Sequence, residues 1–226
     1  MIAVARWRVA VSLRSMSIVA PALAELLFLG VMFTTAPQTG PSALAATAMA
    51  MFVLGLWFSS VNAGALGVAA RNTTSVSAGL IPAFIGEVLA GAAVVGGATV
   101  VAVVASRPVQ APALGPVPSL LGFAAVLSCG LVGVGAAAVL TALRLGTAPR
   151  VVLSMLVLVS GTVSDRSGRL GFGIVLPPAL RVAQAIDQNL VDHPASVVVA
   201  IAVALAWSFG AALIAVALVR WREDRP

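Results

Sequence analysis

Six long apolar runs, separated by short polar breaks, occupy nearly all of this 226-residue chain. Most of the runs reach the ~20 residues that a helix needs to cross the ~30 Å hydrocarbon core of a bilayer. Hydrophobic residues make up 61% of the sequence and charged residues 9%, whereas soluble domains are roughly half apolar and about a quarter charged. We therefore expect an all-α, polytopic membrane protein, because a helix satisfies its own backbone hydrogen bonds in lipid.

The chain is predicted to form one transmembrane domain, residues 1–226, without a separate soluble domain. A cytoplasmic interfacial segment covers residues 1–15, a six-helix bundle covers 16–219, and a cytoplasmic tail covers 220–226. The break at Ala36–Ser42 contains turn residues, and Ser106–Ser119 contains four prolines, too many for a helix interior. The predicted spans are residues 16–36, 43–63, 79–105, 120–143, 150–164 and 195–219.

The distribution of arginine predicts the orientation of the chain. All thirteen basic residues are arginine, and cytoplasmic loops are the ones enriched in basic residues. With the N-terminus inside, nine arginines lie inside and four outside, so both termini are expected in the cytoplasm of a multi-pass cell-membrane protein. The arginine, alanine, valine and glycine content indicates a GC-rich bacterial genome. The inner arginines are Arg6, Arg8, Arg14, Arg71, Arg144, Arg150, Arg220, Arg222 and Arg225, and the outer ones are Arg107, Arg166, Arg169 and Arg181.

Two short segments are predicted to lie along the membrane rather than across it. In residues 1–15, Val4, Trp7 and Val11 form an apolar stripe at helical spacing, so this segment is either an interfacial helix anchored by Trp7 or a plain basic flank. Residues 178–191 form an amphipathic pattern that follows a proline pair, which suits a helix start. Leu180, Ala183, Ile186 and Leu190 are expected on its apolar side. This pattern indicates an interfacial or re-entrant helix at the outer leaflet, with an ordinary surface loop as the alternative.

Two acids, Glu25 and Glu87, lie within predicted spans, about two turns from the cytoplasmic ends. A charge at this depth costs about 2.5 to 3.5 kcal/mol, so such residues either line a substrate path or gate, or pair with another group. The pairing alternatives are Arg14, Arg71, or a hydrogen bond from a protonated carboxyl to a neighbouring helix.

Enzymatic chemistry has little support in the sequence. The chain has one histidine, His193, and one cysteine, Cys129, so no metal-ligand cluster and no disulfide are expected. A serine near the end of the fifth run, Ser160, has no base predicted at its depth. The chain also has no lysine, which the phosphate-binding loop of ATPases requires. No catalytic residue, metal or cofactor is therefore expected on this chain, and any ATP-driven activity requires another polypeptide.

The layout resembles the membrane permease subunits of ABC-2 type exporters, over nearly the whole chain. Residues 3–15 correspond to their N-terminal interfacial helix, and residues 69–78 to a short cytoplasmic helix that docks on the ATPase. The stretch 144–150 corresponds to a second cytoplasmic contact. The segment 171–191, with Leu176, Pro177 and Pro178, corresponds to an outer hairpin with a Leu-Pro step, and Ser160-Gly161 ends the fifth span as in that family.

The resemblance implies a permease subunit that exports an amphipathic drug, antibiotic, lipid or peptide. Its implied partners are ABC ATPase subunits, which would bind ATP and Mg²⁺, a second permease subunit and the lipid bilayer, but not nucleic acid. The substrate path or gate would include Glu25 and Glu87. A secondary transporter or a structural subunit of a membrane complex is the alternative, although no internal repeat relates residues 1–110 to 111–226. The residues implied in ATPase coupling are Arg71, Asn72, Thr73, Thr74, Ser75, Arg144 and Arg150.

Overall fold

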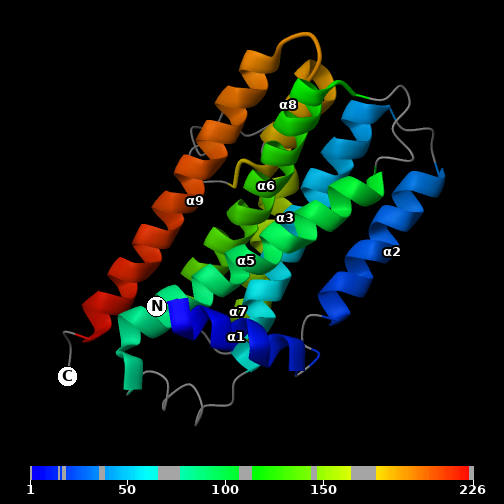
Figure 1. Cartoon of the computed structure of the whole chain (residues 1–226). Helices are drawn as coiled ribbons and strands as arrows, with labels where there is room; N and C mark the ends of the chain where they lie inside the picture. Colours follow the sequence, from blue (N-terminus) through cyan, green and yellow to red (C-terminus); the bar gives the residue numbers. More distant parts are fainter. Residues whose placement is uncertain are drawn as a thin grey trace.

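The computed structural model describes residues 2–14, 16, 19–35, 39–65, 77–106, 114–143, 147–163 and 177–223. This part of the chain contains helices and no strand, which confirms the all-α class for the described residues. The helices are α1 (Ile2–Arg14), α2 (Val19–Thr35), α3 (Gly40–Ala65), α5 (Leu80–Ser106), α6 (Pro116–Ala142), α7 (Thr147–Val163), α8 (Ala179–Asn189) and α9 (Pro194–Glu223) (Figure 1).

Four of these helices are long and apolar enough to cross a membrane. They are the segments Gly40–Val61, Leu80–Ser106, Pro116–Ala142 and Pro194–Arg222. Helices α2 and α7 have 17 residues each, or about 25 Å, which is shorter than the ~30 Å hydrocarbon core. Helix α2 passes the same length test only together with α1, from which it is bent by 69°. The described residues therefore contain four candidate spans, and the other two expected apolar runs correspond to the shorter helices α2 and α7.

The proline-rich break before α6 is shorter than the sequence predicts. Helix α6 begins at Pro116 instead of residue 120, with Gly115 as its N-cap. Proline has no amide hydrogen to donate. This costs nothing in the first turn of a helix, because amides there have no intrahelical acceptor. Pro116 and Pro118 both fall in that turn, so they are compatible with the helix. Helix α3 likewise begins inside the predicted break, where Thr39 Oγ1 accepts the Ser42 amide at 3.3 Å.

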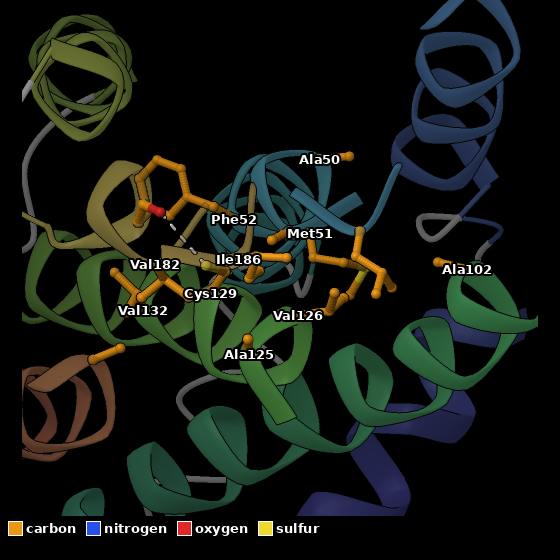
Figure 2. Packing of buried hydrophobic residues seen from close by; sticks show 14 of the residues in the cluster. Ala50, Met51, Phe52, Ala102, Ala125, Val126, Cys129, Val132, Val182 and Ile186 are labelled. Carbon is orange, nitrogen blue, oxygen red and sulfur yellow. Dashed lines mark hydrogen bonds between the residues drawn. The ribbon is translucent and has the colours of Figure 1, made fainter. Parts of the chain in front are cut away.

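Helices α3 and α6 form the centre of the bundle, with α5 and α9 beside them (Figure 1). Their contact buries Met51 and Phe52 of α3 and Val126 and Cys129 of α6, and Ile186 of α8 completes this cluster (Figure 2). All five side chains are fully enclosed. This core therefore lies between the candidate spans α3 and α6, with α8 against it.

Glycine allows the backbones of α3 and α6 to touch. A Cβ atom added at Gly133 would lie 2.3 Å from Phe52 O and 2.6 Å from Leu56 N. One added at Gly55 would lie 2.3 Å from Gly130 O. Small residues at a helix crossing bring the backbones close enough for extensive van der Waals contact, which is a main source of helix association in lipid. The α3–α6 contact therefore depends on the absence of side chains at these positions.

Helix α8 packs on α3, α6, α7 and α9 at the end of the bundle opposite α1 (Figure 1). Helix α8 is amphipathic, as predicted. Its buried side consists of Ala179, Val182, Ala183, Ile186 and, directly after the helix, Leu190. The predicted member Leu180 lies at the edge of this side and is only half-buried. The other three predicted members, Ala183, Ile186 and Leu190, are confirmed as buried. Ala179 and Val182 are buried as well, because α8 is covered by helices on several sides, which widens the face that excludes solvent.

Both chain ends described here lie at one end of the bundle. Helix α1 packs on the first half of α5, and the last turn of α9 reaches the C-terminal end of α6 (Figure 1). Arg222 donates hydrogen bonds from Nη1 to Ala142 O at 2.7 Å and from Nη2 to Leu143 O at 3.0 Å. The guanidinium thus satisfies carbonyls that have no intrahelical partner and complements the negative end of the α6 dipole.

Loss of this contact is expected to weaken the bundle. Arg222→Gln should lower the free energy of unfolding by about 1 to 2 kcal/mol, because it removes charged hydrogen bonds to the end of α6. Thermal unfolding of the purified protein in mild detergent measures the effect. Arg220→Gln is the matched control, since Arg220 is an exposed arginine in the same turn and its loss should cost under about 0.5 kcal/mol. Equal losses for the two variants would contradict the capping role.

Candidate functional site

Helix α1 crosses α5 in close contact. A Cβ atom added at Gly86 would lie 2.6 Å from Val4 Cγ1 and 3.4 Å from Ala5 N, so the glycine lets α1 lie directly on α5. The face of α1 that is buried by this packing carries Arg8 and Ser12, each only 1% exposed. The predicted apolar stripe of α1 is therefore not the buried face: Val4 and Val11 are half-buried, and Trp7 is 41% exposed.

The reason for this polar interface is an ion pair. Arg8 Nη2 donates a hydrogen bond to Glu87 Oε1, two turns into α5, and the Glu87 side chain is 13% exposed. The Arg8 guanidinium also lies 5.7 Å from the centroid of the Trp7 ring, which is within cation–π range. A buried charge of this kind is tolerated only when an opposite charge and hydrogen bonds compensate it. The pair therefore binds α1 to α5.

Arg8 is the described partner of Glu87, and it is not one of the two arginines that were expected as partners. The predicted partner Arg14 is exposed at the end of α1, and Arg71 lies outside the described residues. Glu87 is therefore paired with an arginine, and the role of Glu25 and Glu87 in a substrate path or gate stays a prediction. Arg8 is one of three arginines in a short segment, and helical spacing alone did not distinguish it from the other two.

A small, mainly apolar cavity with three polar lining residues lies beside Glu87, between α3, α5 and α6. It has a volume of about 20 Å³, the size of a single water molecule. Its polar wall consists of Glu87, Ser59 and Thr141, and apolar residues such as Phe84 and Val134 form the rest of its lining. Ser59 Oγ is buried and makes no hydrogen bond to an atom of the described residues. The Arg8–Glu87 pair thus joins α1 to α5, at a place where α5 also meets α3 and α6. Neither Ser59 nor Thr141 was singled out by the sequence.

The other predicted site residues fall in different places. Glu25 lies in α2 and Arg150 in the first turn of α7, and the side chains of both are outside the described part of the structure. Pro177 and Pro178 are buried at the start of α8, where Cys129 Sγ of α6 lies 3.7 Å from the carbonyl oxygen of the first helical residue (Figure 2). The residues that lie wholly outside the described ranges are Arg71, Asn72, Thr73, Thr74, Ser75, Arg144 and Leu176.

A second feature is a wide groove between α2 and α5. Its volume is about 540 Å³, and Leu54 of α3 contributes to its lining. Ala22 and Gly30 belong to the α2 wall, and Gly97 belongs to the α5 wall. Helix α2 packs mainly on α3. The groove lies between α2 and α5.

No family model, curated protein or solved structure matches this chain.

Proposed function

We propose that the chain is the membrane permease subunit of an ABC-2 type exporter, with six spans and both termini in the cytoplasm of a bacterial cell. Helices α2 and α7 are the two spans that complete the bundle, and α8 is the outer-leaflet segment before the last span. Support comes from the order of the elements, in which a short N-terminal helix precedes the spans and a second short helix directly precedes the last one.

The observation that carries the proposal is the attachment of α1 to α5. The Arg8–Glu87 pair and the close packing at Gly86 bind a short helix at one end of the bundle to a candidate span. Because the interface is tightly packed, a displacement of α1 moves α5 with it instead of sliding over it. An ATPase bound at this end would thereby act on the spans, and the amphipathic substrate would cross between two permease subunits.

Purification of the affinity-tagged chain from its own cells in mild detergent tests this function. We expect a separate ATPase subunit to co-purify in a fixed ratio, and vesicles containing the complex to hydrolyse ATP. The expectation follows from the absence of lysine, which excludes a phosphate-binding loop of the usual kind from this chain. A chain that purifies alone and transports a substrate under a proton gradient would instead identify a secondary transporter.

The position of the ATPase contact is tested separately. Replacement of residues 71–75 by alanine should abolish ATPase binding, while the protein elutes as a single species with unchanged thermal stability. Retained ATPase coupling in that variant would refute the placement of the docking helix but not the transport class.

A further inference from the structure

The outer side of helix α1 is both apolar and basic. On a helical wheel the exposed residues of α1 all fall on one side, opposite the buried Arg8 and Ser12. The helix directs its large apolar side chains away from the bundle, because the ion pair with Glu87 lies on the side that packs on α5. Apart from two alanines, the exposed residues are Ile2, Arg6, Trp7, Leu13 and Arg14.

The end of α9 marks the level at which the hydrocarbon core of a membrane would end. Exposed apolar residues follow one another along α9 from Val198 to Ile214, and Arg220 and Trp221 come after them, also exposed. Arginine and tryptophan at the end of an apolar span lie at the level of the lipid headgroups. On α9 the boundary is therefore close to Val219.

The same boundary can be followed from α9 to the crossing of α1 and α5. Val219 of α9 and Phe84 of α5 belong to one buried cluster, so their depths agree to within about one turn of helix. Gly86 and Glu87, which contact α1, come two and three residues after Phe84, or about 3 to 5 Å farther into the bundle. Helix α1 therefore crosses α5 at the boundary between headgroups and acyl chains, where amphipathic helices bind membranes.

The direction of α1 also suits this boundary. It is bent by 69° from α2 and runs across the end of the bundle (Figure 1). A helix at this depth and in this direction presents its outer side to lipid. Leucine and isoleucine then contact acyl chains, tryptophan lies at the boundary, and arginine extends its guanidinium to the phosphates.

The charge of this end of the bundle favours anionic lipid. Its exposed arginines are Arg6, Arg14 and Arg220, and no described side chain at this end is an exposed acid. The opposite end exposes two acids, Asp187 and Asp192, beside Arg181. Arginine binds phosphate oxygens through charge-assisted hydrogen bonds, and each basic residue near an anionic surface strengthens binding by about fivefold.

We propose that the outer side of α1 binds anionic phospholipids of the surrounding membrane. Arg6 and Arg14 contact the phosphates, and Ile2, Trp7 and Leu13 lie among the first methylene groups of the acyl chains. Helix α1 is then held from two sides, by the ion pair on α5 and by lipid. This proposal does not depend on the transport function, because it requires the candidate spans to cross a membrane but neither an ATPase nor a substrate.

The test uses the purified chain in nanodiscs that contain phosphatidylcholine and phosphatidylglycerol, with Trp7 as the reporter. Phenylalanine replaces the other three tryptophans, Trp57, Trp207 and Trp221. Bromine atoms near the headgroup end of the acyl chains quench a tryptophan that the lipid contacts. Brominated phosphatidylglycerol should quench Trp7 more than an equal fraction of brominated phosphatidylcholine does, with a relative binding constant of about 25, or fivefold for each of the two arginines on α1.

The double variant Arg6→Gln with Arg14→Gln should lower this relative binding constant to about 1, because it removes the charges but keeps the length of α1. Arg181→Gln is the matched control, since Arg181 is an exposed arginine of α8 at the opposite end, and it should leave the constant unchanged. Native mass spectrometry of the chain with all four tryptophans measures the same ratio from its phospholipid adducts, which covers the case in which the phenylalanine variant does not fold.

Three results would overturn the proposal. One is equal quenching of Trp7 by the two lipids, and another is a preference for phosphatidylglycerol that survives the double glutamine variant. The third is a Trp7 that neither brominated lipid quenches, because a second copy or another part of the chain would then cover the outer side of α1.

Discussion

Glu87→Gln is expected to lower the free energy of unfolding by about 3 kcal/mol, the largest effect of any single polar change in the described chain. The substitution preserves the shape of the side chain and removes its charge. Arg8, 1% exposed, then remains buried without the carboxylate that compensates it. Breaking one partner of a buried ion pair costs about 3 to 5 kcal/mol, because the surviving charge has lost its solvation.

Titration of the purified protein with sodium dodecyl sulfate, followed by the fluorescence of its four tryptophans, measures this loss. Arg14→Gln is the matched control, since Arg14 is an exposed arginine on the same helix and its loss should change stability by less than about 0.5 kcal/mol.

The double variant Arg8→Met with Glu87→Met separates a specific ion pair from mere packing. Replacing both charges by apolar side chains of similar length should restore most of the stability, since no uncompensated charge is then buried. If the double variant is as unstable as Glu87→Gln, or if Glu87→Gln behaves like Arg14→Gln, the pair does not hold α1 on α5.

Gly133→Ala is expected to be comparably destabilising, by about 3 kcal/mol or more, although it adds a single methyl group. Its Cβ would lie 2.3 Å from Phe52 O and 2.6 Å from Leu56 N, and backbone atoms of α3 cannot rotate away. Helices α3 and α6 would have to separate, and overpacking of this kind costs about 1 to 3 kcal/mol or more even where side chains can adjust.

A graded series of glycine-to-alanine variants tests this explanation with the same chemical change at each position. Gly96→Ala, in open space, should be neutral or stabilising by up to about 1 kcal/mol, because alanine favours helix more than glycine does. Gly135→Ala, whose Cβ would lie 3.2 Å from Ser208 O, should fall between Gly96→Ala and Gly133→Ala. The same detergent titration ranks the three, and any other order would show that the approach of a neighbouring helix does not set the cost of an added methyl group.

The positions of the helices could be predicted from the sequence, because hydrophobicity and breaks are local properties. The runs expected at 43–63 and 79–105 are observed as Gly40–Ala65 and Leu80–Ser106, so the boundaries differ by a few residues. The start predicted for the fourth run, residue 120, is too late because proline ends a helix in its interior but is compatible with its first turn, and α6 begins at Pro116. The spacing of residues 178–191 predicted a helix there as well, and α8 covers Ala179–Asn189.

The candidate site could be predicted only in part. Glu87 stood out because an acid is costly in an apolar run. Its partner did not, because Arg8 lies 79 residues away and was one of three arginines in an apparently amphipathic segment. The same limit applies to Ser59 and Thr141, which are ordinary residues in their own helices and become a polar wall only where α3, α5 and α6 meet.

The sequence by itself indicated a helical chain of the kind found in membranes, the places of its apolar helices to within a few residues, and an acid inside one of them. These follow from composition and periodicity, which act within a single helix. Only the tertiary structure decided that Arg8 neutralises that acid, that glycines bring α3 against α6, and that α2 leaves an apolar groove beside α5. Those features depend on which faces of distant helices meet, and a pattern within one helix does not specify the face of another.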